Sequence, residues 1–138
     1  MKVLILNGPN LNLVGKREPE IYGNQSFDEF IPMLRKSFAD WEIQHEQTNH
    51  EGILIDLLHQ AEGRFDAVIL NPGGYSHTSV ALADAIRSIS VPVVEVHLSN
   101  IHARENYRQQ SLTASACRGI ISGFGLSGYK LALESLQK

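Results

Sequence analysis

Two ionisable side chains stand two residues apart where an apolar run ends. Glu95 and His97 close the Val-rich segment 91–97, and residues two apart on a strand share one face. A buried carboxylate is costly unless it is paired, and a purely structural Glu–His pair would meet that need. We favour a catalytic pair, in which Glu95 fixes the tautomer and orientation of His97 and leaves the other ring nitrogen free for proton transfer.

A second pair of candidates lies in segment 15–23, whose glycines and proline are typical of a mobile lid over a site. An unperturbed tyrosine has a pKa of about 10, too high for a base at neutral pH. A cation ~4 Å away, at an effective dielectric constant of ~20, interacts by roughly 4 kcal/mol. Arg17 could therefore make Tyr22 a usable base, although a loop arginine and tyrosine taken alone are more often surface residues.

Short apolar segments predict the strands that would position these residues. Four runs rich in Val, Ile and Leu are typical of parallel strands buried on both faces, and a fifth, weakly alternating segment predicts an edge strand. The four runs are residues 3–6, 67–70, 91–96 and 119–121, and the edge strand is 42–48.

Amphipathic segments between the strands predict five helices. The first begins at Ser26, which forms a capping box with Glu29, and Pro32 fits poorly inside it. Its apolar face is Phe30, Leu34 and Phe38. The second carries Ile53, Leu54, Leu57 and Leu58; the third spans 79–89 with Val80, Ala83 and Ile86 spaced for burial; the last two span 104–114 and 127–136.

Alternating strands and helices predict a single α/β domain over residues 1–138, a flavodoxin-like, doubly wound five-stranded parallel sheet of order 2-1-3-4-5. Ligands of such sheets bind beyond the carboxyl ends of the strands, here between the first and third strands. Any one polar loop there is more often a simple turn, but three fall at this same end. They are residues 7–23, residues 71–79, and residues 95–100 with Arg104 and Arg108 on the next helix.

Composition excludes several classes of partner and cofactor. The net charge is −3 and no basic tract is present, so neither nucleic acid nor a membrane is expected as a partner. Cys117 is the only cysteine, and we expect it to be a small buried residue. The apolar N-terminal run is too short for a signal peptide, so we expect a cytoplasmic protein. His97 and His102 lack a carboxylate cluster, and we expect no metal.

Gly123-x-Gly125-x-x-Gly128 matches the dinucleotide-binding fingerprint. Only ten residues follow it, which leaves no room for a second strand with its ribose-binding acid. We interpret these glycines as a tight turn and a close helix contact, and we expect no cofactor.

Four motifs are similar to those of the type II dehydroquinases, and the resemblance covers almost the whole chain. They are Asn7-Gly8-Pro9-Asn10-Leu11-Asn12; Arg17-Glu18-Pro19 with Tyr22-Gly23; Asn71-x-Gly73-Gly74-x-x-His77-Thr78-Ser79; and Glu95-Val96-His97-x-Ser99-Asn100-x-His102-x-Arg104. Val14 stands where leucine is expected, Ser76 where threonine is frequent, and Pro32 is unusual. We expect these departures to affect local packing and no residue that contacts substrate.

The resemblance implies a cofactor-free hydro-lyase that converts 3-dehydroquinate to 3-dehydroshikimate by anti elimination through an enolate. That reaction serves the shikimate pathway of aromatic amino acid biosynthesis, or quinate breakdown. Tyr22, activated by Arg17, would take the C2 proton. Asn10 would hold a water on the enolate oxygen, and His97, oriented by Glu95, would protonate the departing hydroxyl. The implied substrate-binding residues are Asn71, His77, Asp84, Leu98, Ser99, Arg104 and Arg108.

The resemblance also implies a homo-oligomer, a dodecamer built as a tetramer of trimers, in which Asp84 reaches a neighbouring subunit's site. Asp84 could equally be a solvated helix carboxylate. Two alternatives stay open: a flavodoxin-like module that binds a flavin or receives a phosphoryl group, and an inactive paralogue. Schiff-base chemistry is disfavoured, because no lysine follows a core strand and the chain is too short for an eight-fold barrel.

Overall fold

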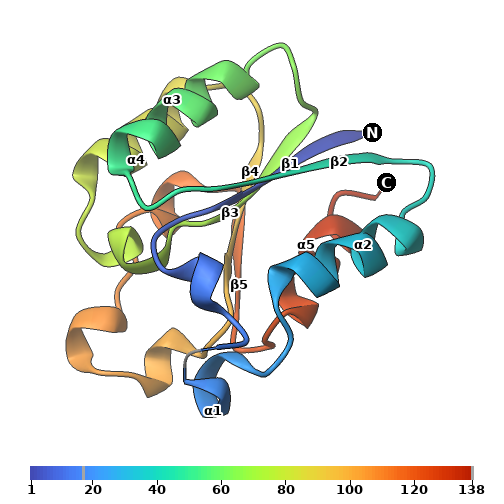
Figure 1. Ribbon diagram of the computed structural model, residues 1–138. Coiled ribbons are helices and arrows are strands. Elements are labelled where there is room, and N and C mark those ends of the chain that lie inside the picture. Colours follow the sequence, from blue (N-terminus) through green and yellow to red (C-terminus); the bar gives the residue numbers. More distant parts are fainter. Residues whose placement is uncertain (17, 138) are drawn as a thin grey trace.

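Five parallel strands form the centre of the molecule, in the order β2-β1-β3-β4-β5 (Figure 1). The computed structural model describes residues 1–16 and 18–137, apart from the side chain of Tyr22. The strands are β1 (Lys2–Asn7), β2 (Glu42–Gln47), β3 (Ala67–Asn71), β4 (Val93–His97) and β5 (Gly119–Ser122). The predicted strands, their order and the edge position of β2 are confirmed.

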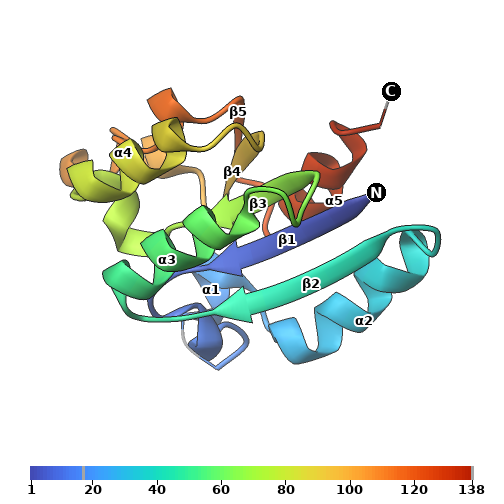
Figure 2. The ribbon, with the colours of Figure 1, turned by 90° about the horizontal axis from the view of Figure 1, so that it is seen from above.

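The sheet separates two apolar cores because side chains alternate across each strand. On β1, Val3 and Ile5 pack toward α2 (Phe27–Ser37) and α5 (Ser127–Glu134), whereas Leu4 and Leu6 pack toward α3 (Glu51–Ala61) and α4 (Val80–Ser88). Figure 2 shows the two helix pairs on opposite faces. All four of these side chains are at most 1% exposed, which explains why the strand reads as one continuous apolar run.

The capping box at Ser26 is confirmed. The Ser26 hydroxyl accepts a hydrogen bond from the backbone N–H of Glu29, and α2 starts at the next residue. Pro32 lies inside the helix on its exposed side. The carbonyl of Asp28 therefore has no N–H partner at Pro32, and it lies on an exposed residue in the first turn, where water can replace that partner.

Three apolar side chains lie at exposed positions, against expectation. Val80 on α4 is 63% exposed, because the buried face of that helix runs through Leu82 and Ile86. Ile53 on α3 is 45% exposed, because the buried face there runs through Leu54 and Leu58. Ile120 on β5 is 44% exposed. The prediction that run 119–121 is buried on both faces was wrong, since β5 is the outer strand and pairs with β4 alone among the described strands.

The helix predicted over residues 104–114 does not form. Two short 3₁₀ turns, η4 (Asn106–Arg108) and η5 (Ala114–Ala116), stand there instead. The segment between them is held away from helical geometry by tertiary partners: Leu112 donates its N–H to the carbonyl of Ser76, and Ser111 and Thr113 donate their hydroxyls to Glu95. This irregular segment lies against the loop after β3 and the end of β4.

Glycines at the start of α5 pack as expected. Gly123 and Gly125 have positive φ angles of 99° and 58°, which suit a tight turn. A Cβ on Gly128 would lie 3.1 Å from Val96 Cγ1, so the helix approaches β4 closely there. No helix among the described residues is long and apolar enough to cross a membrane.

Candidate active site

The loops that follow β1 and β3 are packed against each other at the switch point of the sheet. Gly8 donates its N–H to the carbonyl of Asn71 at 2.7 Å. A Cβ on Gly8 would lie 2.6 Å from the Pro72 carbonyl oxygen. Gly73 has a φ of +59°, and a Cβ on it would lie 3.0 Å from the Pro9 carbonyl oxygen. The two glycines therefore permit a backbone contact that brings both loops to one site.

A pocket of about 150 Å³ opens between these loops and the end of β4. Eight of the predicted site residues line it: Asn10, Asn71, His77, His97, Leu98, Ser99, Arg104 and Arg108. Arg17 lies outside the described residues, as does the Tyr22 side chain. The backbone of Tyr22 ends the short helix α1 (Pro19–Tyr22), and its neighbours Ile21 and Gly23 border an adjoining hollow that shares Leu98, Ser99 and Arg104 with the pocket.

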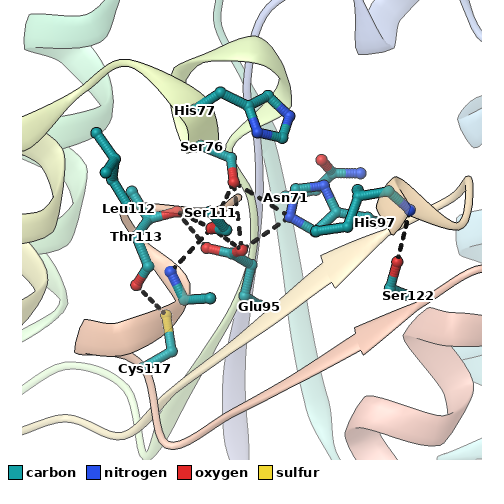
Figure 3. Close-up of polar contacts among 12 residues, drawn as sticks. Asn71, Ser76, His77, Glu95, His97, Ser111, Leu112, Thr113, Cys117 and Ser122 are labelled. Atoms are coloured by element: carbon teal, nitrogen blue, oxygen red, sulfur yellow. Dashed lines mark hydrogen bonds and ion pairs between the residues drawn. The ribbon is translucent and has the colours of Figure 1, made fainter. Parts of the chain in front are cut away.

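His97 reaches the pocket with its ring held from behind. Its Nε2 lies 2.8 Å from Glu95 Oε2 (Figure 3). A carboxylate can only accept, so Nε2 carries a hydrogen in either charge state of the ring. Nδ1 makes no hydrogen bond to any described residue, and it is the nitrogen that binds or releases a proton. The expected geometry of the pair is confirmed.

Glu95 is fully buried, and it is surrounded by hydrogen-bond donors. Besides His97, Ser111 donates to Oε2 at 2.7 Å, Ser76 lies 3.4 Å from the same oxygen, and Thr113 makes a short hydrogen bond to Oε1 (Figure 3). Burial raises the pKa of this carboxyl, but the hydrogen bonds and the charge of His97 outweigh burial and hold the pKa below its ordinary value. Glu95 is therefore ionised at neutral pH.

The sequence did not single out the hydroxyls that hold Glu95. Ser111 and Thr113 lie inside the helix that was predicted over residues 104–114, and Ser76 was expected to affect local packing only. That expectation was wrong for Ser76, whose hydroxyl lies 3.4 Å from His97 Nε2. Val14 packs in the apolar core and also borders the pocket. The buried charge of Glu95 was the signal that could have found them, since it requires donors from some neighbouring segment.

Two cations face the pocket beside one carboxylate. Glu105 Oε2 lies 3.7 Å from Arg104 Nε and 3.0 Å from Arg108 Nε. Arg104 also donates to the Ser99 hydroxyl at 3.1 Å. Arg108 Nε is buried. Although it lies close to Glu105, its N–H forms no hydrogen bond to any described residue. Arg104 and Arg108 thus bring two guanidinium groups to the wall of the pocket, in a protein whose net charge is −3.

His77 and Asn71 also line the pocket, and backbone groups fix both side chains. His77 Nδ1 lies 2.8 Å from the carbonyl of Gln110, so Nδ1 is the donor and a neutral ring keeps Nε2 as an acceptor. Asn71 Oδ1 accepts from the N–H of Gly73 at 3.2 Å. The rings of His77 and His97 have their centroids 6.1 Å apart, so an acceptor and a proton-transfer group lie close together in the lining of one small pocket.

Two predicted features lie away from this pocket. Asp84 is on α4, where its side chain is 69% exposed and lies 3.7 Å from Arg87. Cys117 is half-buried, which is less than expected, and its thiol donates a hydrogen bond to the Thr113 carbonyl. Burial, together with the charge of Glu95, raises the pKa of this thiol to about 12. No group of three or more His, Cys, Asp and Glu side chains with the geometry of a metal site occurs in the described part of the chain.

Comparison with known proteins gives one consistent result. The family model described as "Dehydroquinase class II" matches residues 1–137. The 3-dehydroquinate dehydratase 1 of Agrobacterium fabrum is 51% identical over 137 residues, covering 98% of this chain and 94% of that protein. That of Thermoanaerobacter pseudethanolicus is 49% identical, covering 99% and 93%. The crystal structure of the type II dehydroquinase from Butyrivibrio crossotus superposes with a TM-score of 0.96 at 41% identity, covering 100% and 98%.

Proposed function

Since this chain belongs to the class II dehydroquinase family and is a hydro-lyase that dehydrates 3-dehydroquinate, we propose that the pocket beside His97 is where the reaction takes place. The observation that carries this proposal is the buried Glu95–His97 pair, which opens through Nδ1 of His97 onto a pocket with two arginines. The product is 3-dehydroshikimate, formed when one proton leaves C2 and the hydroxyl leaves C1 as water.

His97 is the general acid in this proposal. The ionised Glu95 keeps a hydrogen on Nε2, and in the imidazolium form Nδ1 carries the proton to be donated. That proton goes to the C1 oxygen as the C–O bond breaks, so water leaves in place of hydroxide. The ring then returns to its neutral form, with Nδ1 as an acceptor.

Tyr22 is the base that takes the C2 proton, and Arg17 lowers its pKa in this role. These roles rest on the family motif Arg17-Glu18-Pro19 with Tyr22-Gly23. Asn10 positions a water on the enolate oxygen that develops between the two proton transfers. The position of Asn10 in the pocket lining supports its role, as does its left-handed backbone, with a φ of 69°.

The remaining pocket residues hold the substrate. Its carboxylate binds the backbone N–H groups of Leu98 and Ser99, beside the guanidinium group of Arg104 that lines the same pocket. The ring hydroxyls bind His77 and Arg108, together with Asn71. His77 Nε2 is suited to accept from a hydroxyl because Nδ1 is already used as a donor.

Turnover by variants of Tyr22 tests the assignment of the base. The substrate lacks the conjugated enone of the product, so ultraviolet absorbance follows the reaction directly. Tyr22→Phe is expected to lower kcat by ~10²-fold or more. Tyr107→Phe removes a hydroxyl that contacts Glu105 outside the pocket lining, from a side chain that is 66% exposed, and is expected to change kcat by less than about twofold. Equal rates for wild type and Tyr22→Phe would exclude Tyr22 as the base.

We also propose that the enzyme is a dodecamer, a tetramer of trimers, in which Asp84 completes a neighbouring subunit's site. The exposure of Asp84 on α4, away from its own pocket, supports this role. A mass in solution of twelve 15.3 kDa chains is expected, and a monomeric mass at full activity would contradict it. A cytoplasmic location is proposed as well, since a lone cysteine persists as a thiol in a reducing compartment.

A further inference from the structure

A line of four buried or half-buried polar side chains runs from the pocket to the edge strand β2. Asn71 Nδ2 donates to the hydroxyl of Tyr129 at 3.0 Å, and that hydroxyl donates to Asn7 Oδ1 at 2.7 Å. Asn7 Nδ2 in turn lies 3.0 Å from His45 Nε2. Asn71 lines the pocket, whereas Tyr129, Asn7 and His45 do not.

The sequence of donors and acceptors along this line can run in only one direction. The backbone N–H of Gly73 can only donate, so the oxygen of the Asn71 amide faces Gly73 and its nitrogen faces Tyr129. The Tyr129 hydroxyl accepts that hydrogen bond, and its own proton must go to Asn7. The oxygen of Asn7 therefore faces Tyr129, and its nitrogen faces His45.

His45 must then be an acceptor at Nε2, which requires a neutral ring. Burial lowers the pKa of His45, and the charge of Arg35 lowers it further, against smaller opposing effects of Glu46 and Asp28. The ring also stacks on Phe27, with centroids 5.6 Å apart. Both ends of the line are thus fixed, one by a backbone N–H and the other by a neutral imidazole.

Tyr129 is completely buried, and nothing in the proposed reaction uses it. Burial raises the pKa of its hydroxyl, so the group stays protonated and can donate to Asn7. Removal of this hydroxyl would leave Asn71 Nδ2 and Asn7 Oδ1 without these partners. The Asn71 amide could then rotate away from Gly73, and its remaining N–H and lone pair would no longer be held for a ligand.

We propose that Tyr129, Asn7 and His45 are positioning residues that fix the orientation of the Asn71 amide in the substrate pocket. This inference rests on the proposed function, in which Asn71 binds a ring hydroxyl of the substrate. The three residues touch no substrate and act only through Asn71, so their effect falls on substrate binding and disappears when Asn71 is absent.

A double-mutant cycle tests this dependence. Tyr129→Phe is expected to raise KM by about tenfold with a smaller change in kcat, the size expected for one buried hydrogen bond to a neutral partner. In an Asn71→Ala background the same substitution is expected to change KM by less than about twofold. A wild-type KM in Tyr129→Phe, or an undiminished effect in the Asn71→Ala background, would overturn the proposal.

A pair of His45 variants gives a second test that leaves the core tyrosine in place. In His45→Gln the side-chain oxygen can accept from Asn7 Nδ2, so KM is expected to remain within about twofold of the wild-type value. His45→Leu lacks an acceptor and is expected to raise KM several-fold. Equal KM values for the two variants, at equal thermal stability, would overturn the proposal.

Crystal structures of the variants provide a readout that needs no turnover. Rotation of the Asn71 amide off the Gly73 N–H in Tyr129→Phe and His45→Leu, and its retention in His45→Gln, would support the inference even if the wild type proved inactive. An unmoved Asn71 in all three would overturn it. Wild-type protein that does not dehydrate 3-dehydroquinate would instead contradict the proposed function.

Discussion

Glu95 keeps a negative charge at a position that excludes water. A carboxylate there is stable only because Ser111, Thr113 and His97 donate to it, and the net effect is a lowered pKa. The same hydrogen bonds fix which nitrogen of His97 can exchange a proton. At the scale of single residues, stability and catalysis therefore depend on one charge.

That charge makes stability depend on pH in a defined direction. The folded-state pKa of Glu95 lies below its ordinary value of 4.5. Its stabilising contribution is therefore fully present above about pH 4.5 and is lost as the pH falls through the folded-state pKa. Thermal unfolding between pH 3 and 7 is expected to show a steeper acid-side loss in wild type than in Glu95→Gln. Parallel curves would contradict an ionised Glu95.

The donors to Glu95 are expected to contribute measurably by themselves. Thr113→Val keeps the shape of the side chain but removes a fully buried donor, which is expected to cost ~1–3 kcal/mol of unfolding free energy. Its kcat is expected to fall as well, because His97 is less firmly oriented. Ser115→Ala, at an exposed position two residues along, serves as the control in denaturant titrations and is expected to be neutral. Equal stability of the two variants would argue against the role of Thr113.

At the scale of elements, the carboxyl ends of β1, β3 and β4 bring three loops together. Short apolar runs and the flavodoxin-like order were sufficient to predict this meeting, because parallel strands end at one edge of the sheet. Residues 104–114 were not predictable in the same way. Their helical pattern is overridden by the needs of Glu95 and Ser76, partners that no local pattern of residues 104–114 reveals.

The contact between the first and third loops is expected to tolerate no side chain. Gly8→Ala would place a Cβ 2.6 Å from the Pro72 carbonyl oxygen, so the loops must separate, at an expected cost of ~1–3 kcal/mol and with loss of activity. Gly52→Ala is the matched control, because nothing lies within 4 Å of its Cβ position in α3. It is expected to be neutral or to stabilise by up to ~1 kcal/mol. Calorimetric unfolding of the two variants would compare them, and an unchanged Gly8→Ala would contradict the close packing.

The burial pattern of α3 can be tested with two adjacent residues. Leu54 is fully buried, and its truncation to alanine is expected to cost ~2–5 kcal/mol. Ile53, which is 45% exposed, is expected to lose less than ~1 kcal/mol on the same change. Urea denaturation would compare the two. A larger loss at Ile53 than at Leu54 would contradict this burial pattern.

At the scale of the whole molecule, the only cysteine of the chain, Cys117, is half-buried against the core that α3 and α4 cover. Burial and the negative charge of Glu95 raise the pKa of Cys117 to about 12, so it remains a thiol at pH 8. Native protein is expected to react with a disulfide reagent much more slowly than denatured protein. Rapid stoichiometric labelling of the native protein would contradict this burial.

The most direct test of the central claim is absorbance of the conjugated enone during turnover of 3-dehydroquinate, with two histidine variants in parallel. Wild type and His102→Gln, whose exposed ring lies outside the pocket lining, are expected to produce the enone at equal rates. His97→Gln, if folded to wild-type stability, is expected to be slower by ~10²- to 10⁴-fold, the usual contribution of a general acid. A flat trace from folded wild type, or an undiminished rate in His97→Gln, would contradict a hydro-lyase whose acid is His97.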